Sequence, residues 1–122
     1  MTPPRNSNPA VANREPLRVA IVGLGTVGVG VIRLLETNAA LIERRAGRAI
    51  RVVAVSARDQ HHDRGIDLSR YRWVADPTDL ATASDVDAIV EVIGGAEGAA
   101  LTLARAALSA GKAFVTANKA MI

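Results

Sequence analysis

A glycine-rich segment between two different hydrophobic patterns restricts the possible folds of this chain more than any other feature. The segment, Gly23–Gly28, has the spacing Gly-x-Gly-x-x-Gly. It follows Leu17–Val22, a short apolar run typical of a strand buried on both faces. Apolar residues at helical spacing come after it and end at Gly47. This order of strand, glycines and helix predicts the start of a βαβ unit with a phosphate-binding turn.

Each glycine of this turn has a separate predicted task. Gly23 makes the tight turn, Gly25 lets the backbone approach a pyrophosphate, and Gly28 lets the helix pack closely on the strand. The phosphates would then meet free backbone N–H groups at the positive end of the helix dipole. We therefore take the whole turn as candidate cofactor-binding residues: Gly23, Leu24, Gly25, Thr26, Val27 and Gly28.

The rest of the chain alternates between short apolar runs and helical patterns. Further strands are predicted at 50–55, 72–74, 88–93 and 113–116, and helices at 27–46, from 76 onward, and at 97–110. The apolar side of the first helix is predicted to include Val27, Val31, Leu34 and Leu35. Strands separated by helices indicate an α/β fold with a Rossmann-type, doubly wound parallel sheet. No closing helix follows residue 116, so the sheet is expected to be incomplete at the C-terminus.

The length of 122 residues allows one domain, with residues 17–122 as its extent. Residues 1–16 hold four of the five prolines and are predicted to be a disordered leader. The net charge is only +3 and three aromatic residues are available for stacking, which argues against a nucleic-acid partner. No apolar run is long enough to span a membrane, no signal peptide is visible, and cysteine is absent. We expect a cytoplasmic protein.

The end of the second predicted strand bears on which dinucleotide would bind. NAD-specific sites usually place an acidic residue there, on the ribose 2′-OH. This chain has Ser56 and Arg58, which suit a 2′-phosphate, while Asp59 comes a little late for the usual carboxylate. The sequence favours NADP as the cofactor and leaves NAD open.

Further candidates follow the fourth and fifth strands, at the same predicted edge of the sheet. Gly94 and Gly95 would let the nicotinamide half of a cofactor pass close to the backbone. Lys119, one of two lysines, could reach a reacting carbonyl or the cofactor, although a surface position is the simpler interpretation. Glu91 interrupts an apolar strand, and we interpret it as a buried acceptor for backbone N–H groups.

Other polar pairs are weaker candidates. His61 and His62 are adjacent and lack a third ligand nearby, so no metal site is predicted. Asp85 and Asp87 are interpreted as turn residues rather than a catalytic pair.

Three segments in this order resemble the cofactor domain of the homoserine dehydrogenase family. They are Val19–Gly28, Glu91–Gly95 and Val115–Ala120, and the stretch Gly65–Pro77 looks like that of bacterial members. The resemblance extends from about Leu17 to the last residue.

The resemblance implies NAD(P)-dependent interconversion of L-aspartate 4-semialdehyde and L-homoserine, in the pathway to threonine and methionine. It assigns the pyrophosphate to Gly23–Gly28, NADP selection to Arg58, and the nicotinamide and substrate side to Lys119, now a candidate catalytic residue. Family members continue with a substrate and dimerisation domain that holds further catalytic Asp and Lys residues. The chain is therefore expected to be a fragment, inactive by itself, of a homo-oligomeric enzyme with a small-molecule substrate.

Two other functions remain open on sequence grounds. One is another two-domain dehydrogenase or reductase with the same glycine turn, such as an aspartate dehydrogenase-like or dihydrodipicolinate reductase-like enzyme. The other is a stand-alone dinucleotide-binding module without catalysis.

Overall fold

One parallel sheet forms the centre of the molecule. The computed structural model describes residues 15–60, 62–93 and 97–117, so most of the predicted leader lies outside the described residues. The sheet has the strand order β3-β2-β1-β4-β5, and every neighbouring pair is parallel. The strands are β1 (Leu17–Val22), β2 (Ile50–Ser56), β3 (Arg72–Trp73), β4 (Ala88–Glu91) and β5 (Ala113–Thr116). The predicted Rossmann-type topology is confirmed.

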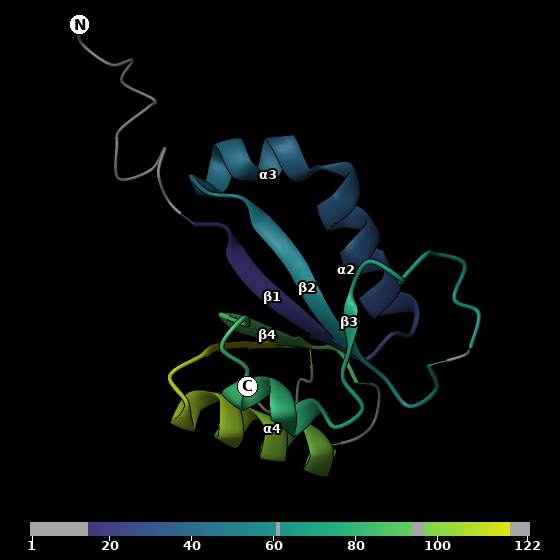
Figure 1. Ribbon diagram of the computed structural model, residues 1–122, viewed down its shortest axis with the longest axis vertical. Coiled ribbons are helices and arrows are strands. Elements are labelled where there is room, and N and C mark those ends of the chain that lie inside the picture. Colours follow the sequence, from purple (N-terminus) through teal and green to yellow (C-terminus); the bar gives the residue numbers. More distant parts are fainter. Residues whose placement is uncertain (1–14, 61, 94–96, 118–122) are drawn as a thin grey trace, which may run out of the picture.

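Helices cover both faces of this sheet, as a doubly wound fold requires (Figure 1). The helices are α2 (Thr26–Thr37), α3 (Ala39–Ala46), a 3-10 helix η2 (Pro77–Thr82) and α4 (Glu97–Ser109). Figure 1 shows α2 and α3 on one side of the strands and α4 on the other. None of the helices in the described parts of the chain is long and apolar enough to cross a membrane.

Alternating residues of the strands divide the core into two layers. Ala20 and Val22 of β1 face the layer that contains Leu80 of η2 and Leu103 of α4. Ile21 of the same strand faces the other layer, together with Ile32, Val52 and Val55. All these side chains are buried, which fits the prediction of strands covered on both faces.

The single helix predicted between the glycine turn and Gly47 is wrong, because the structure breaks it at Asn38. Both the backbone N–H and the side-chain amide of Asn38 donate to the carbonyl of Leu34, at 3.0 and 3.2 Å. A side-chain amide that bonds the local backbone in this way competes with helix propagation. The predicted end is confirmed, since Gly47 closes α3 in the left-handed conformation with φ of 81°.

The predicted apolar face of the first helix is also displaced. Val27 and Leu34 are 58% and 56% exposed, whereas Gly28 and Ile32 are buried. The face that meets the sheet runs through Gly28, Val31, Ile32 and Leu35, which is a regular helical stripe with a glycine as its first member. The apolar pattern alone misjudged the rotation of the helix because glycine contributes no apolar side chain to it.

Other element boundaries agree closely with the sequence. The helix predicted from Asp76 onward is the 3-10 helix η2, and the Asp76 side chain caps it by accepting from the Thr78 N–H at 3.0 Å. β4 ends at Glu91, two residues before the predicted end, and β3 has only two residues. Gly111 closes the last helix with φ of 78°.

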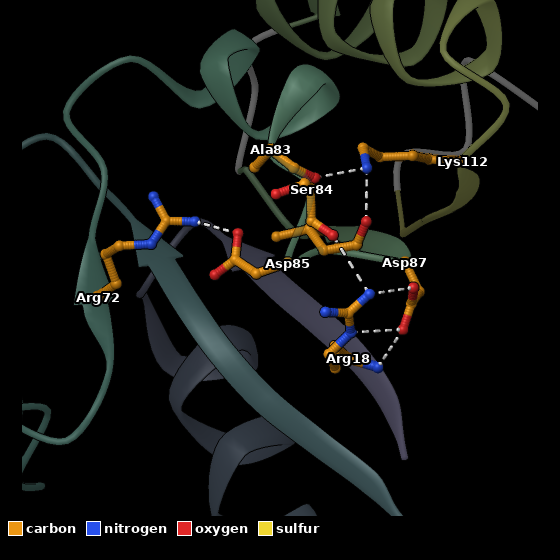
Figure 2. Close-up of polar contacts among 8 residues, drawn as sticks. Arg18, Arg72, Ala83, Ser84, Asp85, Asp87 and Lys112 are labelled. Carbon is orange, nitrogen blue, oxygen red and sulfur yellow. Dashed lines mark hydrogen bonds and ion pairs between the residues drawn. The ribbon is translucent and has the colours of Figure 1, made fainter. Parts of the chain in front are cut away.

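Ion pairs join the strands at their amino-terminal ends, away from the glycine turn (Figure 2). The Arg18 side chain donates to both carboxylate oxygens of Asp87 at 3.0 and 3.1 Å, and its backbone N–H donates at 2.8 Å. Asp85 pairs with Arg72 at 2.7 Å. Lys112 Nζ donates to the carbonyls of Ala83 and Val86. Asp85 and Asp87 therefore hold strand starts in place, in agreement with the structural interpretation.

We predict that the Arg18–Asp87 pair makes the fold sensitive to acid. Hydrogen bonds from the Arg18 side chain and backbone lower the pKa of Asp87 from 3.8 to about 2. The stabilisation is present above the unfolded-state pKa and is lost as the pH falls from about 4 toward about 2. Urea unfolding of Asp87→Asn across this range should show a smaller decrease in midpoint than the wild type.

The matched control for this prediction is Asp85→Asn. Its pair with Arg72 is more exposed and more strongly screened by solvent, so acid sensitivity should stay close to that of the wild type. An unchanged acid response in Asp87→Asn would contradict the role of the Arg18–Asp87 pair.

Candidate dinucleotide-binding site

The glycine turn joins β1 to α2 in a geometry that two of its glycines require. Gly23 has φ of +99°, and a Cβ there would lie 2.9 Å from the carbonyl carbon of Val92. A Cβ on Gly28 would lie 1.9 Å from the carbonyl oxygen of Gly23, which no real structure permits. The helix can therefore approach the turn this closely only with glycine at position 28.

Gly25 differs from these two because it faces open space. A Cβ built on Gly25 meets no atom within 4 Å. Gly25 is also the N-cap of α2, and its carbonyl accepts from the Val29 N–H at 3.0 Å. The first N–H groups of a helix have no partner within it, so the positive end of the helix dipole lies next to this open space. The arrangement suits an anion held by backbone N–H groups.

A cavity of about 520 Å³ opens beside the glycine turn, at the carboxyl ends of β1, β2 and β4. Five of the predicted cofactor-binding residues line it: Gly23, Leu24, Gly25, Ser56 and Arg58. Its remaining described lining is Val22, Ala57, His62, Arg64, Ala75, Pro77, Val92, Ile93 and Ala99. Ligands of doubly wound sheets bind at this edge, next to the strand from which the order reverses.

The other predicted residues are distributed differently. Thr26 lines an adjoining cavity, which shares Leu24, Gly25, His62 and Arg64 with the first. Val27 is exposed and lines neither of these two cavities. Gly28 is buried against the turn. Gly94, Gly95 and Lys119 lie outside the described residues.

The end of β2 reaches the cavity directly beside the glycine turn. The Gly23 N–H donates to the Ser56 carbonyl at 2.8 Å, which holds the two segments together. Ser56 is 2% exposed, while the Arg58 side chain is exposed and lies on the same cavity. None of the ion pairs within the described part of the chain includes Arg58.

A second arginine also lines this cavity, and no local sequence pattern indicated it. Arg64 comes from the loop between β2 and β3, which was predicted only as polar loop. Its Nε donates to the Leu24 carbonyl at 3.2 Å, a bond between positions 40 residues apart. Its guanidinium carbon lies 5.7 Å from the centre of the Trp73 ring, within range of a cation–π interaction.

The buried Glu91 side chain holds Ile93, one of the residues that line the cavity. It is 0% exposed at the end of β4. Its carboxylate accepts from the Ile93 N–H at 2.6 Å and from the Thr116 hydroxyl at 2.5 Å. The predicted role as a buried acceptor is confirmed, and the contacts join the segment after β4 to the end of β5.

A metal centre at His61 and His62 was not predicted from the sequence. His61 lies outside the described residues, and His62 is exposed at the rim of the cavity. Among the described residues, no group of three or more His, Cys, Asp or Glu side chains is arranged to hold a metal ion.

Comparison with known proteins agrees with the topology and the glycine turn. The family model described as "Homoserine dehydrogenase, NAD binding domain" matches residues 23–122. The chain belongs to the homoserine dehydrogenase family. Homoserine dehydrogenase of Pseudomonas aeruginosa is 44% identical over 108 residues, which are 88% of this chain and 24% of the relative.

Solved structures of the family show the same fold. A homoserine dehydrogenase from Thiobacillus denitrificans is 40% identical with a TM-score of 0.77, covering 86% of this chain and 24% of that one. The Staphylococcus aureus enzyme, in a crystal structure at pH 7.0, is 34% identical with a TM-score of 0.77, covering 88% and 27%. The chain thus spans about a quarter of the length of the relatives it matches.

Proposed function

We propose that residues 17–122 are the cofactor-binding domain of a homoserine dehydrogenase. The enzyme would interconvert L-aspartate 4-semialdehyde and L-homoserine in the cytoplasm, as a step of threonine and methionine biosynthesis. Family membership supports a nicotinamide dinucleotide as the cofactor. The relatives are about four times longer than this chain, so we propose that other catalytic groups and the contacts of a homo-oligomer belong to the corresponding additional length.

The observation that carries the proposal is the open backbone at Gly25 beside the N-terminus of α2. Any side chain at position 25 would project into the space that a pyrophosphate needs. Gly23 and Gly25 line one cavity with Ser56 and Arg58, so the phosphates and the adenosine ribose of one ligand could be bound together. The residues present therefore fit a dinucleotide.

We infer that the preferred cofactor is NADP. A bound dinucleotide would donate or accept the hydride, and this chain's own residues would bind and orient it. Backbone N–H groups of the turn hold the pyrophosphate, and the Arg58 guanidinium offers a fork of donors to a 2′-phosphate. The buried Ser56 sits at the same wall, where a carboxylate would mark an NAD site.

Arg58→Ala is expected to weaken NADPH binding by at least about tenfold and NADH binding by less than about twofold. Only NADPH has the 2′-phosphate that Arg58 would contact. Fluorescence titration of both nucleotides against the 122-residue chain measures the two affinities. Arg51→Ala is the matched control, because Arg51 is exposed near the start of β2, at the opposite end of the strand that Arg58 follows. Equal losses for both nucleotides would contradict the 2′-phosphate role.

We propose that Lys119 lies on the nicotinamide and substrate side of the cofactor. Lys119→Ala should then weaken NADPH about threefold or more while leaving 2′,5′-ADP, which lacks the nicotinamide half, within about twofold. Isothermal titration of both ligands gives the comparison. A loss of the same size for 2′,5′-ADP would place the lysine elsewhere.

A further inference from the structure

Arg64 is held at the candidate cofactor site by its own main-chain contacts. Its Nε, Nη1 and Nη2 atoms donate to the carbonyls of Leu24, His62 and Asp59, at 3.2, 3.0 and 2.6 Å. Guanidinium has five N–H donors, so two remain for another acceptor. The Arg64 guanidinium is therefore held in place by three hydrogen bonds, and it keeps two N–H donors for a ligand.

The placement brings Arg64 to the cavity beside the end of β2, where dinucleotide sites of this fold usually bind the adenosine ribose. Leu24 follows Gly23, whose N–H is bonded to the Ser56 carbonyl at 2.8 Å. A group attached to Leu24 is thus close to the end of β2, and Arg58 and Arg64 both line the same cavity. Two arginines that are six positions apart in one loop therefore line the same cavity.

The guanidinium of Arg64 is not paired with a carboxylate in the described part of the chain. Its three acceptors are neutral carbonyls. The Trp73 ring, whose centre lies 5.7 Å from the guanidinium carbon, stabilises the cation by a cation–π interaction and carries no opposite charge. A half-buried cation of this kind attracts an anionic group that enters the cavity.

We propose that Arg64 is a specificity-determining residue that binds the adenosine 2′-phosphate together with Arg58. The inference rests on the proposed dinucleotide-binding function and extends it. Selection of NADP over NAD would then depend on two guanidinium groups. One is the exposed Arg58 directly after β2, and the other is Arg64, held in advance on the glycine turn.

The loop that carries Arg64 is also bonded to α2, so a substitution at Arg64 leaves other contacts that hold the loop in place. Arg33 of α2 donates to the Gly65 carbonyl at 2.9 Å. The Tyr71 hydroxyl bonds to Glu36 on the same helix. These ties join the loop to α2 independently of Arg64. Arg33 lines the adjoining cavity that contains Thr26, whereas Arg70 of the loop pairs with Glu36 at 3.6 Å and lines neither cavity.

The test compares two adenosine fragments, 2′,5′-ADP and 5′-AMP, by isothermal titration against the 122-residue chain. Arg64→Gln should weaken 2′,5′-ADP by about tenfold or more and change 5′-AMP by less than about twofold. Arg70→Gln is the matched control, because it removes a loop attachment and an arginine charge outside both cavities of the candidate site. It should leave both affinities within about twofold.

The comparison of the two fragments shows whether Arg64 contacts the 2′-phosphate or only holds the loop in place. Equal losses for the two fragments in Arg64→Gln, unchanged binding of both, or the same selective loss in Arg70→Gln would overturn the inference. If the wild-type chain binds 5′-AMP and 2′,5′-ADP equally well, the inference fails while dinucleotide binding stands. If the wild type binds neither fragment, the proposed function fails, and the inference with it.

Discussion

Replacing Gly28 by alanine is expected to destabilise the fold by about 3 kcal/mol or more. The new Cβ would lie 1.9 Å from the Gly23 carbonyl oxygen and 2.9 Å from its carbon, and both are backbone atoms that cannot rotate away. Helix α2 must then move off the turn, which opens the packing of Ile32 against the sheet. Urea unfolding followed by circular dichroism measures the loss.

Gly30→Ala is the matched control for this prediction. Gly30 lies in the same helix, is exposed, and its added Cβ would meet no atom within 4 Å. Alanine is the better helix former, so this variant should be more stable than the wild type by about 0.5–1 kcal/mol. A Gly28→Ala protein as stable as the wild type would contradict the close approach of helix and turn.

The second large effect is expected at Glu91. Glu91→Leu should cost about 2 kcal/mol of stability, since the carboxyl accepts two hydrogen bonds in a fully buried position. Leucine has a similar volume but no acceptor, so the Ile93 N–H would lose its hydrogen-bond partner. Urea unfolding measures the cost.

Glu43→Leu provides the comparison for Glu91, because Glu43 is exposed near the end of α3. Its replacement should change stability by no more than about 0.5 kcal/mol. Equal, small effects at the two positions would show that the buried carboxyl is not needed for the wall after β4.

The sequence predicted the parts of this fold that depend on local patterns. The apolar runs located all five strands of the described sheet, and the spacing of the glycines located the turn, whose geometry requires glycine at positions 23 and 28. Ser56 and Arg58 were expected at the site because the end of the second strand is where dinucleotide-binding folds recognise the ribose, and both line the cavity.

What the sequence missed depends on contacts between distant segments. The rotation of α2 follows from the backbone contact of Gly28 with Gly23, which an apolar pattern does not record. The break at Asn38 comes from a side-chain bond that competes with the helix. Arg64 binds carbonyls, and one of these belongs to Leu24, so neither residue type nor spacing indicated that contact.

The contact between Arg64 and Trp73 gives the molecule an optical property of its own. Trp73 is the single tryptophan of the chain, so the tryptophan fluorescence of the protein comes from this one side chain. That place is the ring beneath the guanidinium that lines the cavity. The chain therefore carries an intrinsic reporter next to its candidate ligand site, and occupancy can be followed without attaching a label.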